Sequence, residues 1–198
     1  MSSEKKDGIT PDEVGIRLYT SFAGVLLGIC VALVVLLLSY GEGETIFYSY
    51  SISCLVISAF SWLQTYEWYV YFIGTKKESD FKIGSIFYYI GYLSLILAFV
   101  FLFINFKFLY PYLISIAFSF YALFHVVKDI YLRQKSEKGF MKYISKDYQY
   151  LLTFSIILYT IFLLYGLYAS FKLFVLDPWV LHKSERKNCI PIRYWNRL

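Results

Sequence analysis

The sequence predicts an all-α protein, a polytopic transmembrane helical bundle with a four-helix core and a fifth, C-terminal hydrophobic helix. Its composition is the first reason, because 59% of the residues are hydrophobic, 17% are charged and the mean hydropathy is +0.55. A soluble domain is about half apolar and about a quarter charged. The second reason is that the apolar residues form continuous blocks, each long enough to cross a hydrocarbon core of about 30 Å as a helix.

These blocks divide the chain into three parts. Residues 1–15 form a polar segment that we expect to be cytoplasmic, residues 16–174 form the transmembrane domain, and residues 175–198 form a basic polar tail. The transmembrane domain contains five predicted spans and one basic connector: 16–40, 46–66, 85–106, 109–127 and 151–174, with the connector at 128–150.

The first span carries small residues at every fourth position, namely Thr20, Gly24, Gly28 and Ala32. Residues four apart share one face of a helix. A strip of small side chains lets two helix backbones approach closely in lipid, where van der Waals packing replaces the missing hydrophobic drive. The strip therefore predicts a helix-packing face, either against another helix of the same chain or between protomers.

The second span follows an acidic turn, Gly41–Thr45, and ends among aromatic side chains that are typical of a membrane interface. Its helix is expected to continue to about Ile73, and a loop at 74–84 with Lys76, Lys77 and Lys82 leads to the third span. Further along, the connector 128–150 is expected to be either an amphipathic surface helix, interrupted at Gly139, or a solvated link.

Two stretches of the chain resemble each other at a fixed offset, Tyr48–Tyr69 and Tyr110–Tyr131. Tyr48 aligns with Tyr110, and the acidic Glu67 aligns with Asp129. Fixed-period similarity is a sign of duplication, so the core is either two duplicated hairpins or four independent spans that end in similar interfacial residues.

The distribution of basic residues predicts a cytoplasmic N-terminus. The turn after the first span has no Lys or Arg and the turn after the third has only Lys107, whereas the alternate loops are basic. If 151–174 also spans, the basic tail lies outside. The alternative is a re-entrant or packed fifth segment, which leaves both termini inside.

A few polar residues near the predicted span ends are candidates for function: Gln64, Glu67, His125, Asp129 and Arg133. His125, Asp129 and Arg133 are four apart and form a ladder on one helix face. One hypothesis is a proton or ion site that uses Glu67, His125 and Asp129, since ionisable groups inside a bilayer are costly and usually functional. The other is an interfacial cluster that anchors helix ends.

The sequence argues against most catalytic classes. Its only histidines are His125 and His182, too few for a zinc site with three or four ligands. It contains no phosphate-binding, dinucleotide-binding or hydrolase motif. We therefore expect no enzyme activity, no metal, no cofactor and no direct nucleic-acid binding.

Three functions remain open. The first is a non-catalytic integral membrane protein that acts by association, as an accessory, scaffold or regulator of a larger membrane or defence system. The second is a small oligomeric pore, and the third is a proton- or ion-coupled carrier using Glu67, His125 and Asp129. The expected partners are the bilayer and other membrane subunits or further copies of the chain.

In size and layout, though in no residue pattern, the chain resembles small multi-span accessory proteins encoded beside nucleases in prokaryotic defence loci, including type VI-B CRISPR systems. Subunits of large respiratory assemblies share this layout. The expected location is a bacterial inner membrane, with an organelle inner membrane as the alternative.

Overall fold

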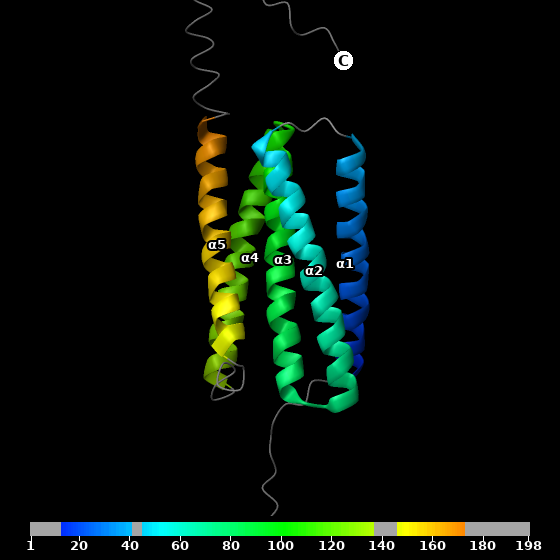
Figure 1. The fold of residues 1–198 in the computed structure, drawn as a ribbon. Coiled ribbons are helices and arrows are strands. Elements are labelled where there is room, and N and C mark those ends of the chain that lie inside the picture. The colour runs from blue at the N-terminus through cyan, green and yellow to red at the C-terminus, as the bar shows by residue number, and fades with distance from the viewer. Residues whose placement is uncertain (1–12, 41–44, 137–145, 173–198) are drawn as a thin grey trace, which may run out of the picture.

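The structure, a computed structural model, describes residues 13–40, 45–136 and 146–172. These ranges contain five long helices that run alternately up and down the molecule (Figure 1). They are α1 (Glu13–Tyr40), α2 (Ile46–Thr75), α3 (Glu78–Asn105), α4 (Leu109–Ser136) and α5 (Lys146–Phe171).

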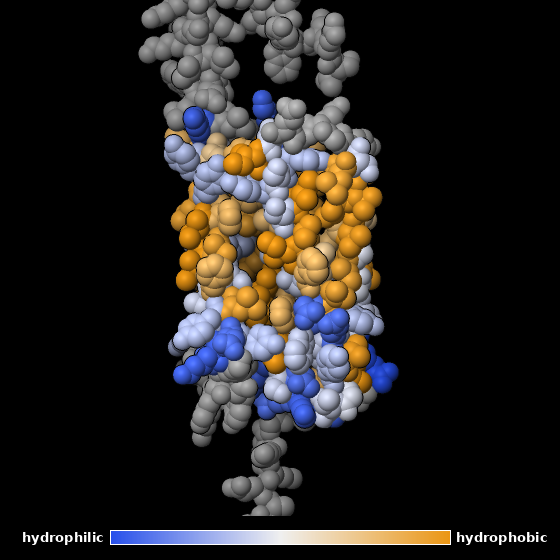
Figure 2. Space-filling view, viewed as in Figure 1, coloured by the Kyte–Doolittle hydropathy of each residue, from blue (hydrophilic) through white to orange (hydrophobic). Residues whose placement is uncertain are grey.

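All five helices are long and apolar enough to cross a membrane. Figure 2 shows hydrophobic side chains gathered across the middle of the visible face, with hydrophilic side chains toward its two ends. An apolar belt with polar ends is the surface that a bilayer requires. The chain is therefore an integral, multi-pass membrane protein, as the sequence predicts.

Helix α3 is the central element of the bundle. Half of its most apolar window is buried, whereas the corresponding fraction is 17% for α1 and α4 and 22% for α5. Helices α2, α4 and α5 all pack on α3, and α1 packs mainly on α2. The remaining faces of the outer helices are apolar and exposed, which suits contact with lipid.

Helices α2 and α3 meet along an antiparallel seam of small residues. On each helix these residues recur at every seventh position: Ser51, Ser58 and Thr65 on α2, and Gly84, Gly91 and Ala98 on α3. The Ser51 hydroxyl donates to the Ala98 carbonyl at 2.9 Å, and the Ser58 hydroxyl donates to the Gly91 carbonyl at 2.8 Å. Such bonds need close backbones, which the small side chains permit.

Two glycines of this seam leave little or no room for a side chain. A Cβ atom at Gly84 would lie 2.6 Å from the ring of Tyr69, and one at Gly91 would lie 3.1 Å from the indole of Trp62. Both aromatic residues are buried, at 4% and 0% exposure. The large rings therefore pack over the glycines and fill the space that the absent side chains leave.

The turn between α2 and α3 is shorter than the predicted loop at 74–84, since it consists of Lys76 and Lys77 only. Lys76 adopts a left-handed conformation (φ 55°) and closes α2 by donating its backbone N–H to the Phe72 carbonyl. Lys82 lies inside α3, where its ammonium group pairs with Glu78 at 2.6 Å. The prediction that α3 begins near residue 85 is thus wrong, because charged residues at 78–82 pair and form its first turns.

Helix α1 packs through a different seventh-position series from the predicted strip. Ile16, Ala23, Cys30 and Leu37 are all buried, and they face α2 and the nearest side chains of α3. The Cys30 thiol lies 3.5 Å from the Ser58 hydroxyl. At the far end, the Tyr48 hydroxyl donates to the Leu37 carbonyl.

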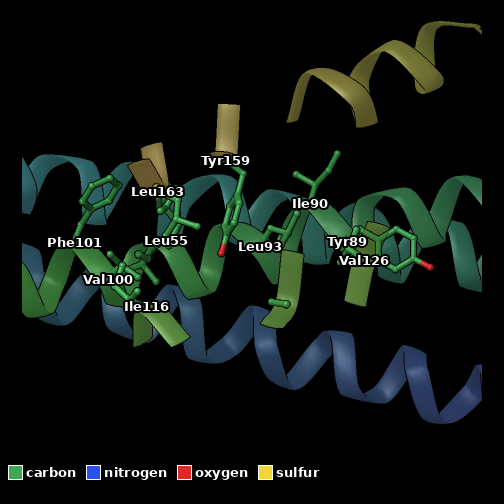
Figure 3. Close-up of a cluster of buried hydrophobic side chains, with 14 of the residues drawn as sticks. Leu55, Tyr89, Ile90, Leu93, Val100, Phe101, Ile116, Val126, Tyr159 and Leu163 are labelled. Atoms are coloured by element: carbon green, nitrogen blue, oxygen red, sulfur yellow. The ribbon is translucent and has the colours of Figure 1, made fainter. Parts of the chain in front are cut away.

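Helices α4 and α5 complete the other side of α3. Tyr112 of α4 pairs with Ser170 of α5 at 2.5 Å, and Tyr159 of α5 donates to the Ser119 carbonyl at 3.4 Å. Figure 3 shows the cluster of hydrophobic side chains between these helices. Helix α5 is continuous over its whole length, which favours five spans over a re-entrant segment.

The two similar stretches form α2 and α4, which run in the same direction through the bundle. Their matched positions have different surroundings, however. Trp62 is fully buried whereas Phe124 is 66% exposed, and Tyr48 is 9% exposed whereas Tyr110 is 78% exposed. The structure therefore gives no support to two hairpins with equivalent packing.

We expect Gly84→Ala to lower stability by about 1–3 kcal/mol, because the methyl group would overlap the buried Tyr69 ring. The matched control is Gly28→Ala, where no atom lies within 4 Å of the added Cβ. Thermal unfolding in mild detergent compares the two variants. Equal midpoints would contradict the close-packed seam.

Candidate functional site

A concave site with polar and aromatic lining is a groove of about 390 Å³ between α1 and α4, which we call the tyrosine groove. Helix α3 forms most of its floor. Eleven residues from four helices line it: Tyr19, Tyr69, Phe81, Ser85, Tyr88, Tyr89, Tyr92, Tyr121, His125, Val126 and Asp129.

The floor of the groove is buried and its rims are open. Tyr69, Tyr89 and Val126 are 4%, 6% and 2% exposed, whereas the rim residues Tyr19 and Tyr121 are 49% and 61% exposed. Figure 3 places Tyr89 and Val126 together at one end of the hydrophobic cluster. The floor is thus part of the folded core, and the rims are accessible from the surface of the protein.

The rings of the groove hold one another in place. Tyr88 meets Tyr19 edge-on, with centroids 6.1 Å apart and planes at 86°. It also contacts the buried Trp62, at 5.2 Å and 89°, and the rings of Tyr89 and Tyr92. Tyr69 stacks on Phe81 at 5.6 Å. Edge-to-face and offset pairs of this kind are favourable and directional, so these contacts orient the Tyr19, Tyr69 and Tyr88 rings.

Helix α4 supplies the polar side of the groove. Tyr121, His125 and Asp129 are four apart and therefore lie on one face. The Tyr121 and His125 rings are 6.0 Å apart. The carboxylate of Asp129 is half-buried and accepts a hydrogen bond from the Tyr89 hydroxyl of α3. This bond links α4 to the floor of the groove on α3.

The structure brings only part of the predicted polar set together. His125 and Asp129 both line the tyrosine groove. Glu67 is exposed on α2, outside the groove, and accepts a hydrogen bond from Gln64 at 2.9 Å. The groove therefore contains two of the three residues of that hypothesis, and a proton or ion site that uses Glu67, His125 and Asp129 together stays a prediction. The side chain of Arg133 falls outside the described residues.

The predicted small-residue strip on α1 points mainly away from the rest of the chain. Thr20 is buried and donates to the Ile16 carbonyl at 2.8 Å, but Gly28 and Ala32 are exposed and Gly24 is half-buried. No atom lies within 4 Å of a Cβ placed at Gly24 or Gly28. No helix among the described residues lies close over Gly24 or Gly28, and packing of the strip, within the chain or between chains, stays a prediction.

The tyrosine groove combines aromatic and polar side chains. It offers phenol hydroxyls, aromatic faces, one imidazole and one carboxylate. In the part of the chain that the structure describes, no three His, Cys, Asp or Glu side chains are grouped to hold a metal ion. The sequence already shows Tyr121, His125 and Asp129 at four-residue spacing, but the many other tyrosines obscure the contributions of α1 and α3.

Comparison of the chain with protein-family models, with curated proteins and with solved structures finds no match. Function must therefore be argued from the surfaces and the groove themselves.

We expect Tyr89→Phe to destabilise the bundle by about 1–3 kcal/mol, because Asp129 would lose a charge-assisted hydrogen bond at a half-buried position. The measurement is a double-mutant cycle with Asp129→Asn, read from thermal unfolding in detergent. Coupling below about 0.5 kcal/mol would mean that the bond contributes nothing to packing of α4 on α3. Tyr71→Phe, on the exposed side of α2, is the control.

Proposed function

We propose that this protein is a non-catalytic membrane protein that acts by association, through the outer face of α1 and α2, as an accessory or regulatory component of a larger assembly. The observation that carries the proposal is the uncovered small-residue strip on α1. In lipid, such a strip stabilises a contact only when another helix backbone lies against it.

An adjoining apolar groove extends this face onto α2. It has a volume of about 290 Å³ and is lined by Leu27, Val31, Val34, Val35, Val56, Ala59, Phe60 and Leu63. Gly28 lies one turn before Val31 and two turns before Val35, so the strip and the groove occupy neighbouring parts of one helix surface. A transmembrane helix seated there would bury both at once.

Substitutions at Gly24 and Gly28 distinguish an effect on association from an effect on folding. Because no atom of the described residues lies within 4 Å of a Cβ at Gly24 or Gly28, a larger residue at either position fits this part of the protomer. Any loss of assembly in such a variant therefore reports on contacts with another chain.

We expect Gly24→Ile and Gly28→Ile to dissociate the assembly while the thermal midpoint of the protomer changes little. The bulky side chain holds the partner helix away. Size-exclusion chromatography with light scattering in mild detergent gives the mass of each variant. Val25→Ile, off the strip, is the control and should assemble as the wild type does. Unchanged mass in both glycine variants would contradict the proposed face.

The identity of the partner decides between two forms of association. If purification in mild detergent recovers only further copies of this chain, the assembly is a homo-oligomer. Dye leakage from vesicles that contain the purified protein would then favour the oligomeric pore. Recovery of a different membrane subunit, or of a component of a nuclease-based defence system, favours the accessory role. A wild-type chain that is monomeric and purifies alone in mild detergent would refute association in either form.

A further inference from the structure

A second pocket, of about 110 Å³, lies between α2, α3 and α5 and shares no lining residue with the tyrosine groove. Two of its lining residues come from α2, four from α3 and four from α5, and none of these described residues is charged. Figure 3 shows two of them, Tyr159 of α5 and Leu93 of α3, beside each other. We call this site the α2–α5 pocket.

The α2–α5 pocket is at the middle depth of the bundle. On α5 its lining residues extend from Ser155 to Phe162, and each of these two is nine residues from an end of the helix (146 to 155, and 162 to 171). At about 1.5 Å per residue, the pocket is about 13 Å from either end of α5. Since the hydrocarbon core of a bilayer is about 30 Å thick, the material outside the pocket consists of lipid acyl chains.

Rings from the same three helices close the pocket at one end. Tyr50 of α2, Phe101 of α3 and Phe162 of α5 meet in a triangle. Their centroids are 5.5 Å apart for Tyr50 and Phe101, 5.8 Å for Tyr50 and Phe162, and 6.1 Å for Phe101 and Phe162. These are distances of favourable aromatic pairs, so the three helices are in contact directly beyond the pocket.

A second group of rings joins the three helices on the other side of the pocket. The ring centroid of Tyr148 on α5 lies 6.4 Å from that of Trp68 on α2 and 6.2 Å from that of Phe87 on α3. The α3 residues that line the pocket, within 90–97, lie between Phe87 and Phe101 along the helix. The two groups of rings therefore bound the pocket along the helix axis and hold α5 on α2 and α3 at two levels.

The pocket has a buried floor and an entrance at the lipid-facing surface. Leu93, Leu97 and Tyr159 on the floor are 2%, 4% and 4% exposed, whereas Ile57 of α2 on the rim is 50% exposed. An apolar chain can therefore enter from the membrane, between α2 and α5, without passing through water.

The lining favours hydrocarbon over water or a polar ligand. The Tyr159 hydroxyl donates to a carbonyl of α4 at 3.4 Å, and the Ser155 hydroxyl donates to a carbonyl of its own helix at 2.7 Å, so both protons are used within the protein. The other lining residues are aliphatic or aromatic, apart from Cys54 and Ser94. A buried water needs about two to four polar partners, whereas an apolar cavity of about 150 Å³ stays dry and takes up benzene or xenon.

We propose that the α2–α5 pocket binds the terminal carbons of a lipid acyl chain, which enter beside Ile57 and lie against Leu93, Leu97 and Tyr159. Acyl chain ends are found at the depth of the pocket, near the middle of the bilayer. An empty pocket would deprive its lining of dispersion contacts, and the chain end restores them. The lipid then links α2, α3 and α5 at the level between the two groups of rings. This inference does not depend on the association proposed for α1, because the residues are different.

The test places a photoreactive group at the end of a lipid chain. The full chain is reconstituted in phosphatidylcholine nanodiscs that contain a small fraction of phosphatidylcholine with an alkyl diazirine at the penultimate carbon of one acyl chain. Mass spectrometry after irradiation maps the label, and labelling of the floor is divided by that of Ile161, which is 55% exposed on α5. We expect label on Leu93, Leu97 or Tyr159, because only a chain inside the pocket reaches these buried residues. A second lipid, with the diazirine next to the ester, should label none of them.

Two variants fill the pocket from different helices. Ser94→Leu on α3 and Ser155→Leu on α5 each replace a lining residue by a larger apolar one. Each should lower floor labelling by about fivefold or more, because a close-packed interior has no room for the chain end. Ser53→Leu is the matched control, since it makes the same change at an exposed position of α2, next to Cys54 and outside the pocket. It should leave floor labelling within about twofold of wild type, as surface substitutions do.

Three results would overturn the proposal: no label on the floor of the wild-type protein, equal floor labelling by the two lipids, or unchanged floor labelling in both filled variants. The comparison of the two lipids needs only the wild-type protein, so it decides the question even if neither variant folds. Loss of floor labelling in the filled variants, with labelling retained in Ser53→Leu, would support an acyl chain in the pocket.

Discussion

Close approach of α2 and α3 is the constraint on which the rest of the structure depends. In a bilayer, apolar burial does not drive helices together, so contact must come from van der Waals packing and interhelical hydrogen bonds. The seam supplies both, because Gly84 and Gly91 bring the backbones close and Ser51 and Ser58 donate across to α3 carbonyls. A larger residue at the glycines would separate the helices and break these bonds together.

The seam also determines where the large aromatic residues lie. Trp62 and Tyr69 cover the two glycines, and each then contacts the tyrosine groove, Trp62 through Tyr88 and Tyr69 as part of the floor. Packing in the core is thus physically continuous with the walls of the candidate site. The floor of the groove therefore belongs to the packed α2–α3 pair, while its rim residues Tyr19 and Tyr121 on α1 and α4 are exposed.

The sequence predicts the existence and approximate position of all five helices, because long apolar blocks in lipid must be helical. The helix ends near residues 75–85 are less predictable. A span predicted from hydropathy alone ends where charged residues begin. Lys82 and Glu78 pair, however, so that α3 begins before the predicted span. Similarly, Gly24 and Gly28 match a helix-contact motif, yet the chain uses Gly84 and Gly91, whose seventh-position spacing is a less familiar signal.

The site is predicted in part, and the reason is geometric. His125 and Asp129 lie on one helix, so their proximity follows from the four-residue spacing alone. Tyr89 lines the groove and Glu67 does not, because of how α2, α3 and α4 are rotated about their axes. The residue pattern of a single helix does not specify this rotation. Rotation of α2 and α3 is set by the seam: once Ser58 faces Gly91, Glu67 points away from α3. The same small residues that bring the two helices together therefore decide which acidic residue reaches the groove.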